Sequence, residues 1–145
     1  MRFWDSSAVV PLLVREDATD AVKRLLRDDD QMVVWRLTGA EIVSALWRRR
    51  RADEIDDPTR TGAESALAIL ERAWTTVDDL AHVDRRARRL LAVHALRAAD
   101  ALQLAAALVA CDETPGLLPC VTLDDRLADA ARREGFSVLP GARRT

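Results

Sequence analysis

Four acidic residues stand where a strand should end or a helix should begin, each within apolar sequence: Asp5 in FWDSSAVV, Glu41 in GAEIVSAL, Asp100 in RAADALQLAAAL and Asp124 in VTLDDRL. Carboxylates in such surroundings are unfavourable, because burial disfavours the charged form and neighbouring like charges repel. A divalent cation bound between them would offset both effects. Oxygen donors of this kind suit Mg²⁺ or Mn²⁺, held by a few carboxylates and several waters.

The chemistry that such a cation supports is phosphodiester hydrolysis. A bound metal lowers the pKa of a coordinated water, orients it for in-line attack and neutralises charge on phosphate oxygens. We therefore take Asp5, Glu41, Asp100 and Asp124 as candidate catalytic residues, and a metal-dependent enzyme as the leading hypothesis.

Helix capping offers an alternative interpretation of each acid. Asp5 and Asp124 precede predicted helices and Asp100 precedes the apolar run ALQLAAAL, so each could be a cap, and an N-cap carboxylate stabilises a helix by about 1 kcal/mol. The segment from Thr38 to Glu41 also fits a capping box. Two features favour a shared site: Asp100 has apolar sequence on both sides, and Glu41 borders the apolar stripe of its helix, so that it faces inward or toward a cleft.

Short apolar strands alternate with helices along the chain. This alternation favours an α/β domain with a mainly parallel sheet covered on both faces. Ligands bind such sheets outside the carboxyl ends of the strands, where Asp5 and Asp124 fall. The pattern predicts strands over 1–4, 32–35, 75–77, 117–123 and 136–139, and helices over 6–14, 17–27, from 38 to a loop at 52–58, 61–74, 83–96, 98–111 and 125–134.

Length and composition set the class of protein. We expect the 145 residues to form one domain, 1–145, and 49% hydrophobic residues suffice for its core. A charged fraction of 32% argues for a folded rather than a disordered chain. The sequence holds no run of about 18 apolar residues and its start does not read as a signal peptide. We therefore expect a cytoplasmic protein with no membrane segment.

The basic residues are almost all arginines, since only Lys23 is a lysine. A net charge of −2 excludes a uniformly basic nucleic-acid binder, but arginines gather at Arg48–Arg51, from Arg85 to Arg89, and at Arg97. The planar guanidinium fork suits phosphate. A solvated helix face is the alternative interpretation of each run.

Four segments together resemble the PIN-domain ribonucleases and, within them, the VapC-type toxins of bacterial toxin–antitoxin pairs. The likeness extends over nearly the whole chain, and order, spacing and length agree together. The segments are Phe3-Trp4-Asp5-Ser6-Ser7-Ala8, Glu41-Ile42-Val43-Ser44-Ala45-Leu46, Leu96-Arg97-Ala98-Ala99-Asp100-Ala101-Leu102-Gln103-Leu104-Ala105 and Val121-Thr122-Leu123-Asp124.

The resemblance implies a three-layer α/β/α fold with a short, mainly parallel central sheet, and Mg²⁺- or Mn²⁺-dependent endoribonuclease activity. By position, Asp5 and Asp100 would be the principal metal ligands. Glu41 would be a further ligand or hold a metal-bound water, and Asp124 would act through water or a second metal. Asp125 follows directly, and we favour Asp124 because of its register with the preceding strand.

The resemblance also implies partners. These are an RNA substrate, a cognate antitoxin that blocks the site with an inserted segment, and a second copy of the chain in a homodimer. Ser6 and Thr122 would support the acids through hydrogen bonds. Apolar residues of the early helices, such as Val14, Leu25 and Trp47, would fit a partner groove.

A non-catalytic signalling module with a flavodoxin-like sheet is the alternative function, in which one Asp of an acidic pocket accepts a phosphoryl group. No lysine near the end of the chain completes such a pocket. A phosphatase of the haloacid-dehalogenase type needs Asp-x-Asp after the first strand, where this chain has Asp5-Ser6-Ser7. A phosphate-binding GK[ST] loop does not occur.

Overall fold

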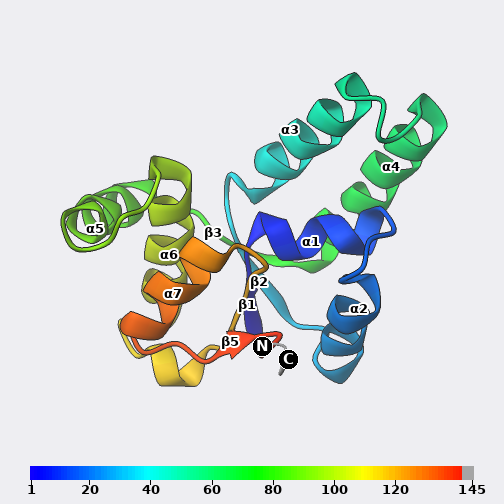
Figure 1. Ribbon diagram of the computed structural model, residues 1–145. Helices are drawn as coiled ribbons and strands as arrows, with labels where there is room; N and C mark the ends of the chain where they lie inside the picture. Colours follow the sequence, from blue (N-terminus) through cyan, green and yellow to red (C-terminus); the bar gives the residue numbers. More distant parts are fainter. Residues whose placement is uncertain (142–145) are drawn as a thin grey trace.

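The structure, a computed structural model, describes residues 1–141 (Figure 1). The predicted domain over 1–145 extends beyond them to 142–145, so its extent stays a prediction. The strands are β1 (Arg2–Trp4), β2 (Met32–Trp35), β3 (Thr75–Val77), β4 (Cys120–Val121) and β5 (Val138–Leu139). The helices are α1 (Ser6–Leu13), α2 (Thr19–Asp28), α3 (Thr38–Arg51), α4 (Asp57–Ala73), α5 (Leu80–Val93), α6 (Ala98–Ala110), the 3₁₀ turn η1 (Pro115–Leu117) and α7 (Asp125–Arg133).

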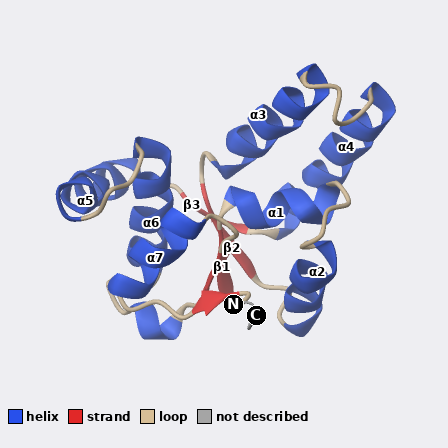
Figure 2. Cartoon of the chain, viewed as in Figure 1, coloured by secondary structure: helices blue, strands red, loops and turns tan. Residues whose placement is uncertain are grey.

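The five strands form one parallel sheet in the order β3-β2-β1-β4-β5 (Figure 2). Each connection between parallel strands contains at least one helix, as parallel pairing requires. The α/β class and the parallel sheet predicted from the sequence are confirmed.

Helices cover both faces of this sheet and create two separate cores. Successive strand residues point to opposite faces, so Phe3 and Trp4 enter different cores. Phe3, Val33 and Trp35 pack with α5, α6 and α7, whereas Trp4 and Val34 pack with α1 to α4. Figure 1 shows these two sets of helices on opposite sides of the strands. The predicted three-layer α/β/α arrangement is confirmed.

Helix α6 is the most deeply buried helix next to the sheet. Its sequence is nearly all apolar, and it packs against α5, α7, β2 and β3. Small alanines such as Ala105 and Ala106 are fully buried and permit this close packing from several sides. Burial of the helix on most faces positions its first turn firmly at the sheet edge.

The strand order reverses beside β1, which places a crevice at the carboxyl ends of β1 and β4. The chain first builds β2 and β3 on one side of β1, then β4 and β5 on the other. Such a switch point is the usual ligand site of an open α/β sheet. Asp5 directly follows β1, and Asp124 is the third residue after β4.

Three predicted boundaries were wrong by several residues. Strand 117–123 shrinks to β4, because Pro115–Leu117 forms a 3₁₀ turn instead. Helix α4 starts at Asp57 rather than 61, since Asp56 caps it, accepting from the Thr59 amide at 2.8 Å, and a proline is tolerated in the first turn. Helix α5 covers 80–93 rather than 83–96.

The apolar residues expected in a partner groove are largely core residues. Val14 is buried, and Leu25 packs against the core on the α1–α4 side. Trp47 remains partly exposed, with the Arg60 guanidinium 4.0 Å from its ring centroid. Among the described residues, no single helix is long and apolar enough to cross a membrane.

Candidate active site

The four predicted acids come from four different helices whose first turns meet at the switch point. Asp5 and Asp124 are the N-caps of α1 and α7, while Glu41 and Asp100 lie in the first turns of α3 and α6. Asp5 is near enough to repel each of the other three electrostatically, and Asp100 likewise repels Asp124 and Glu41. The structure therefore brings together residues separated by over a hundred positions.

Asp5 is almost fully buried, with 4% of its surface exposed. Its Oδ2 atom accepts hydrogen bonds from Thr122 Oγ1 at 3.0 Å, from Ser7 Oγ and from the Ser7 amide at 3.2 Å. Among residues 1–141, its Oδ1 atom receives only a long contact from Ser6 Oγ at 3.4 Å. The capping interpretation is thus right for one oxygen, and the other oxygen is left for a further interaction.

Glu41 does not form the capping box that its sequence suggested. Leu37, not Thr38, is the N-cap of α3, and the Glu41 amide bonds the Leu37 carbonyl within the helix. The side chain turns to the site, where its Oε2 accepts from Ser6 Oγ at 2.9 Å and from Gln103 Nε2 at 3.3 Å. Glu41 is thus the fourth residue of α3, one position beyond the third residue at which a capping-box acid lies.

Asp100 and Asp124 differ in their positions at the starts of their helices, because only Asp124 is an N-cap. Asp100 is not the N-cap of α6, because Arg97 occupies that position and provides no side-chain cap. Asp124 does cap α7, and its Oδ1 accepts from the Leu127 amide at 2.9 Å. Asp125 is the first residue of α7 and is exposed, whereas Asp124 is half-buried.

The surroundings of the acids disfavour their charged forms. Burial raises the pKa of Asp5, and the charge of Asp124 adds to this, although hydrogen bonds from Ser7 and Thr122 oppose it. Burial also raises the pKa of Glu41 and of Asp100, and each is raised further by its acidic neighbours. Within residues 1–141, no ion pair joins any of the four acids to a basic side chain.

Two of the supporting residues were predicted and two were missed. Ser6 and Thr122 make the expected hydrogen bonds to the acids. Ser7 also supports Asp5, and its Oγ accepts from the Leu123 amide at 2.9 Å, tying α1 to the segment after β4. Gln103 is fully buried and holds Glu41 from α6. A signal existed for Gln103, which is the one polar residue of α6 besides Asp100 and follows it by three positions.

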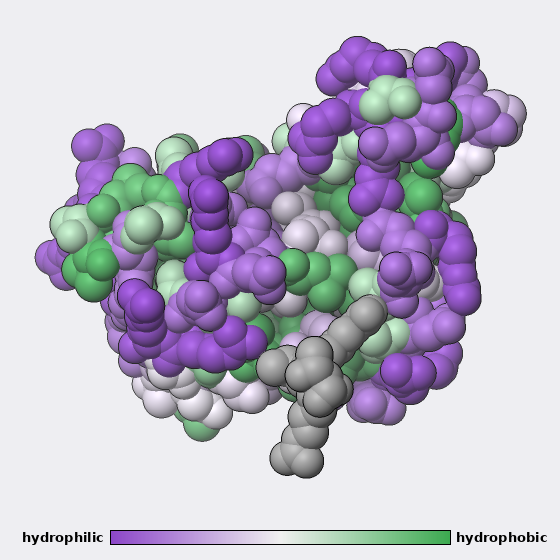
Figure 3. Space-filling model, viewed as in Figure 1, coloured by the Kyte–Doolittle hydropathy of each residue, from purple (hydrophilic) through white to green (hydrophobic). Residues whose placement is uncertain are grey.

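Two pockets flank the acids. The larger, of 760 Å³, lies between α1, α3 and α6, and its walls include Ser6, Glu41, Arg48 and Leu102. The smaller, of 470 Å³, is lined by Arg97, Ala99, Asp100, Asp124, Asp125 and Arg126. Figure 3 shows the surface indented between the α3–α4 side and the α5–α7 side. An extended ligand that passes over the four acids would contact both pockets.

The donor set fits a hard cation such as Mg²⁺ in its chemistry. Only oxygen atoms are offered, and the buried acids raise one another's pKa with no basic side chain paired to them. Within the described residues, no three Asp, Glu, His or Cys side chains converge closely enough to hold a metal ion alone. Mg²⁺ does not need three, because it keeps several waters and binds through one or two carboxylates.

The sequence model of the PIN domain family matches residues 2–133. The chain therefore belongs to the PIN domain family. Ribonuclease VapC45 of Mycobacterium tuberculosis (strain CDC 1551 / Oshkosh) is 34% identical over 145 residues, covering 95% of this chain and 94% of the relative. Ribonuclease VapC46 of Mycobacterium tuberculosis (strain ATCC 25618 / H37Rv) is 35% identical over 140 residues, covering 94% and 95%. Within the family, this chain is of the VapC type, which confirms the resemblance.

Solved structures support the fold. The crystal structure of PAE2754 from Pyrobaculum aerophilum superimposes with a TM-score of 0.64 at 20% identity, covering 89% of this chain and 83% of that one. The crystal structure of FitAcB from Neisseria gonorrhoeae gives a TM-score of 0.65 at 16% identity, covering 95% and 96%. At these identities the likeness concerns the backbone arrangement alone.

Proposed function

We propose that the protein is a metal-dependent endoribonuclease, the toxin of a toxin–antitoxin pair, which hydrolyses phosphodiester bonds in RNA with Mg²⁺ or Mn²⁺. The carrying observation is the set of four carboxylates at the β1/β4 switch point, none of which forms an ion pair with a basic side chain among the described residues. VapC-type relatives that match over nearly the whole chain support the reaction and the substrate. The signalling-module alternative is not favoured, since those relatives carry the name ribonuclease.

Each acid has a role consistent with its surroundings. Asp5 and Asp100 would be the principal metal ligands, with Asp5 offering the Oδ1 atom that its capping bonds leave available. A cation held there would activate a water and neutralise charge on the scissile phosphate. Glu41, held by hydrogen bonds from Ser6 and Gln103, would orient that water. Asp124 would act through water or a second cation.

The proposed partners follow from the VapC likeness. A cognate antitoxin would inhibit by inserting a segment at the acids, and the 760 Å³ pocket beside Glu41 offers space for it. A homodimer of this chain is part of the same proposal. Because RNA is the substrate, we place the protein in the cytoplasm.

The test is cleavage of a labelled single-stranded RNA by purified protein with Mn²⁺, with Mg²⁺ and with EDTA. We expect cleavage with either cation and none in EDTA. Asp5→Asn and Asp100→Asn should each reduce the rate by about a hundredfold or more, the scale of losing one electrostatic contributor to a transition state. Asp20→Asn is the matched control, because Asp20 is an exposed acid of α2, paired with Arg15 at 2.9 Å.

Circular dichroism must show that the variants fold. Undiminished cleavage by a folded Asp5→Asn or Asp100→Asn protein would show that the acid serves only at the start of its helix and has no part in catalysis. Cleavage by the wild type in EDTA would refute the metal dependence. Separate assays on transfer, ribosomal and messenger RNA would identify the target.

A further inference from the structure

Arg97 and Arg126 lie on the smaller pocket beside the acids. Arg97 is the N-cap of α6, and Arg126 is the second residue of α7. Both side chains are exposed, and both line the 470 Å³ pocket that Asp100 and Asp124 share. The fold thus places two guanidinium groups, from distant parts of the chain, at one edge of the acidic site.

Neither arginine is engaged in an ion pair within residues 1–141, although three carboxylates line the same pocket. Other arginines of the same layer behave differently. Arg86 bonds Glu113 at 2.9 Å and Glu134 at 3.2 Å, and Arg132 bonds Asp129 at 3.2 Å. Arg97 is near enough to Asp100 to oppose the rise in its pKa by attraction, but it forms no ion pair with it. The donors of Arg97 and Arg126 therefore remain available to an anionic ligand, and the uncapped start of α6 adds partial positive charge.

We propose that Arg97 and Arg126 together bind a backbone phosphate of the RNA strand, adjacent to the phosphate that is cleaved at the acids. This inference rests on the proposed function for the identity of the ligand. The strand then crosses the acids toward the larger pocket, where Arg48 lines the far side. Phosphate is the anion that the planar guanidinium fork matches in geometry. A strand that reaches Asp100 and Asp124 passes this pocket, because both acids line it.

The experiment compares Arg97→Gln/Arg126→Gln with Arg24→Gln/Arg27→Gln. The control removes the same charge from two exposed arginines three residues apart on α2. Helix α2 leads directly into the start of β2, so its last turn lies at the opposite end of the sheet from the acids. Binding of a labelled single-stranded RNA is measured by anisotropy against salt concentration, in EDTA and in Ca²⁺.

Loss of one phosphate contact should lower the slope of log K against log salt by about 0.7. The Kd of the site variant should rise about tenfold, the scale of one charge-assisted hydrogen-bond contact. The α2 control should show less than half of either change. Arg97→Lys/Arg126→Lys should restore the salt slope but only part of the affinity, because lysine keeps the charge and lacks the fork.

Kinetics with Mn²⁺ give a second measurement. The site variant should raise KM while changing kcat much less, because the four acids are untouched. An equal loss in both double variants, or an unchanged slope in the site variant, would overturn the inference. A wild type that binds RNA in neither buffer would also overturn it. The same holds for a site variant that loses binding of a polyglutamate peptide but keeps RNA binding, since Arg97 and Arg126 would then serve a protein partner. A wild type that binds RNA without cutting it would refute the proposed function alone.

Discussion

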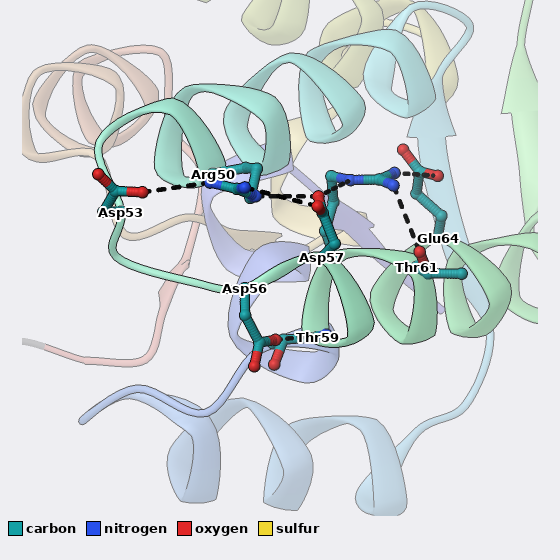
Figure 4. Close-up of polar contacts among 8 residues, drawn as sticks. Arg50, Asp53, Asp56, Asp57, Thr59, Thr61 and Glu64 are labelled. Atoms are coloured by element: carbon teal, nitrogen blue, oxygen red, sulfur yellow. Dashed lines mark hydrogen bonds and ion pairs between the residues drawn. The ribbon is translucent and has the colours of Figure 1, made fainter.

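Two charged regions of the molecule are organised in opposite ways. In the hairpin of α3 and α4, Arg50 Nε donates to Asp57 Oδ1 at 2.9 Å, and Arg50 also bonds Asp53 at 3.2 Å (Figure 4). The hydrogen bond from Arg50 lowers the pKa of Asp57. At the switch point, burial and mutual repulsion raise the pKa of Asp5 and Glu41. Charges are compensated where they hold the fold, and uncompensated where a ligand is expected.

The difference also changes how the arginine run is understood. The sequence suggested that Arg48–Arg51 could act as one phosphate-binding unit. In the structure Arg49 pairs with Glu16, and Arg50 pairs with acids of the hairpin. Arg48 and Arg49 line the larger pocket, but Arg50 does not. Successive residues of a helix point in different directions. The consecutive arginines therefore have different neighbours and do not act as one unit.

The largest predicted difference between the hairpin and the four acids at the switch point is in stabilisation of the fold by Mn²⁺. A cation that binds only the folded state at a hundred times its Kd adds about 2.7 kcal/mol to the free energy of unfolding. We expect this gain for the wild type and for Asp57→Asn, whose acid is already paired. Asp5→Asn should show almost none of it. Thermal unfolding with and without Mn²⁺ measures the effect, and equal gains in all three proteins would place the cation elsewhere.

The second prediction concerns the pH dependence of stability without metal. The folded pKa of Asp5 is raised above its ordinary 3.8, so its favourable contribution is present below pH 3.8 and is lost as pH rises through the folded value. Asp5→Asn should therefore be more stable than the wild type at pH 7, by about 1.4 kcal/mol for each unit of the rise. The difference should vanish below pH 3.8.

Asp57 provides the comparison of opposite sign. Its folded pKa lies below 3.8, so its stabilising contribution is present above pH 3.8 and is lost as pH falls through the folded value. Asp57→Asn should thus be less stable than the wild type at pH 7. Urea unfolding in EDTA from pH 3 to 7 tests both. Two variants that shift in the same direction would contradict the division into compensated and uncompensated regions.

Much of the frame that positions the site could be predicted from sequence. Strands 32–35 and 75–77 match the structure, because short β-branched segments between helical patterns have few alternatives. The placement of Asp5 and Asp124 at strand ends followed from the same alternation. Once the sheet is parallel, strand ends meet at one edge, so proximity of these acids required no knowledge of side chains.

The details that depend on distant contacts could not be predicted. Gln103 Nε2 donates to Thr38 Oγ1 at 3.1 Å across 65 residues of sequence, and no local pattern encodes that pairing. The start of α3 after Leu37 rather than after Thr38 decides that Glu41 is free of a capping box and available to the site. Helix ends are set by a balance of about 1 kcal/mol, which tertiary packing readily overrides.

The smallest expected effect lies in the hairpin. Arg60 bonds Glu64 at 2.8 Å and its guanidinium covers Trp47. Arg60→Met keeps much of the apolar stem but removes the charge, and should lower the free energy of unfolding by about 1 kcal/mol, the sum of a modest cation–π contact and a partly exposed ion pair. RNA cleavage should be unchanged. A double-mutant cycle with Trp47→Leu isolates the ring contact, which should account for most of the loss in high salt, where the partly exposed ion pair is screened. If Arg60→Met instead raised KM as strongly as the Arg97→Gln/Arg126→Gln variant, the hairpin would contact RNA, and compensated charge would no longer distinguish structure from function here.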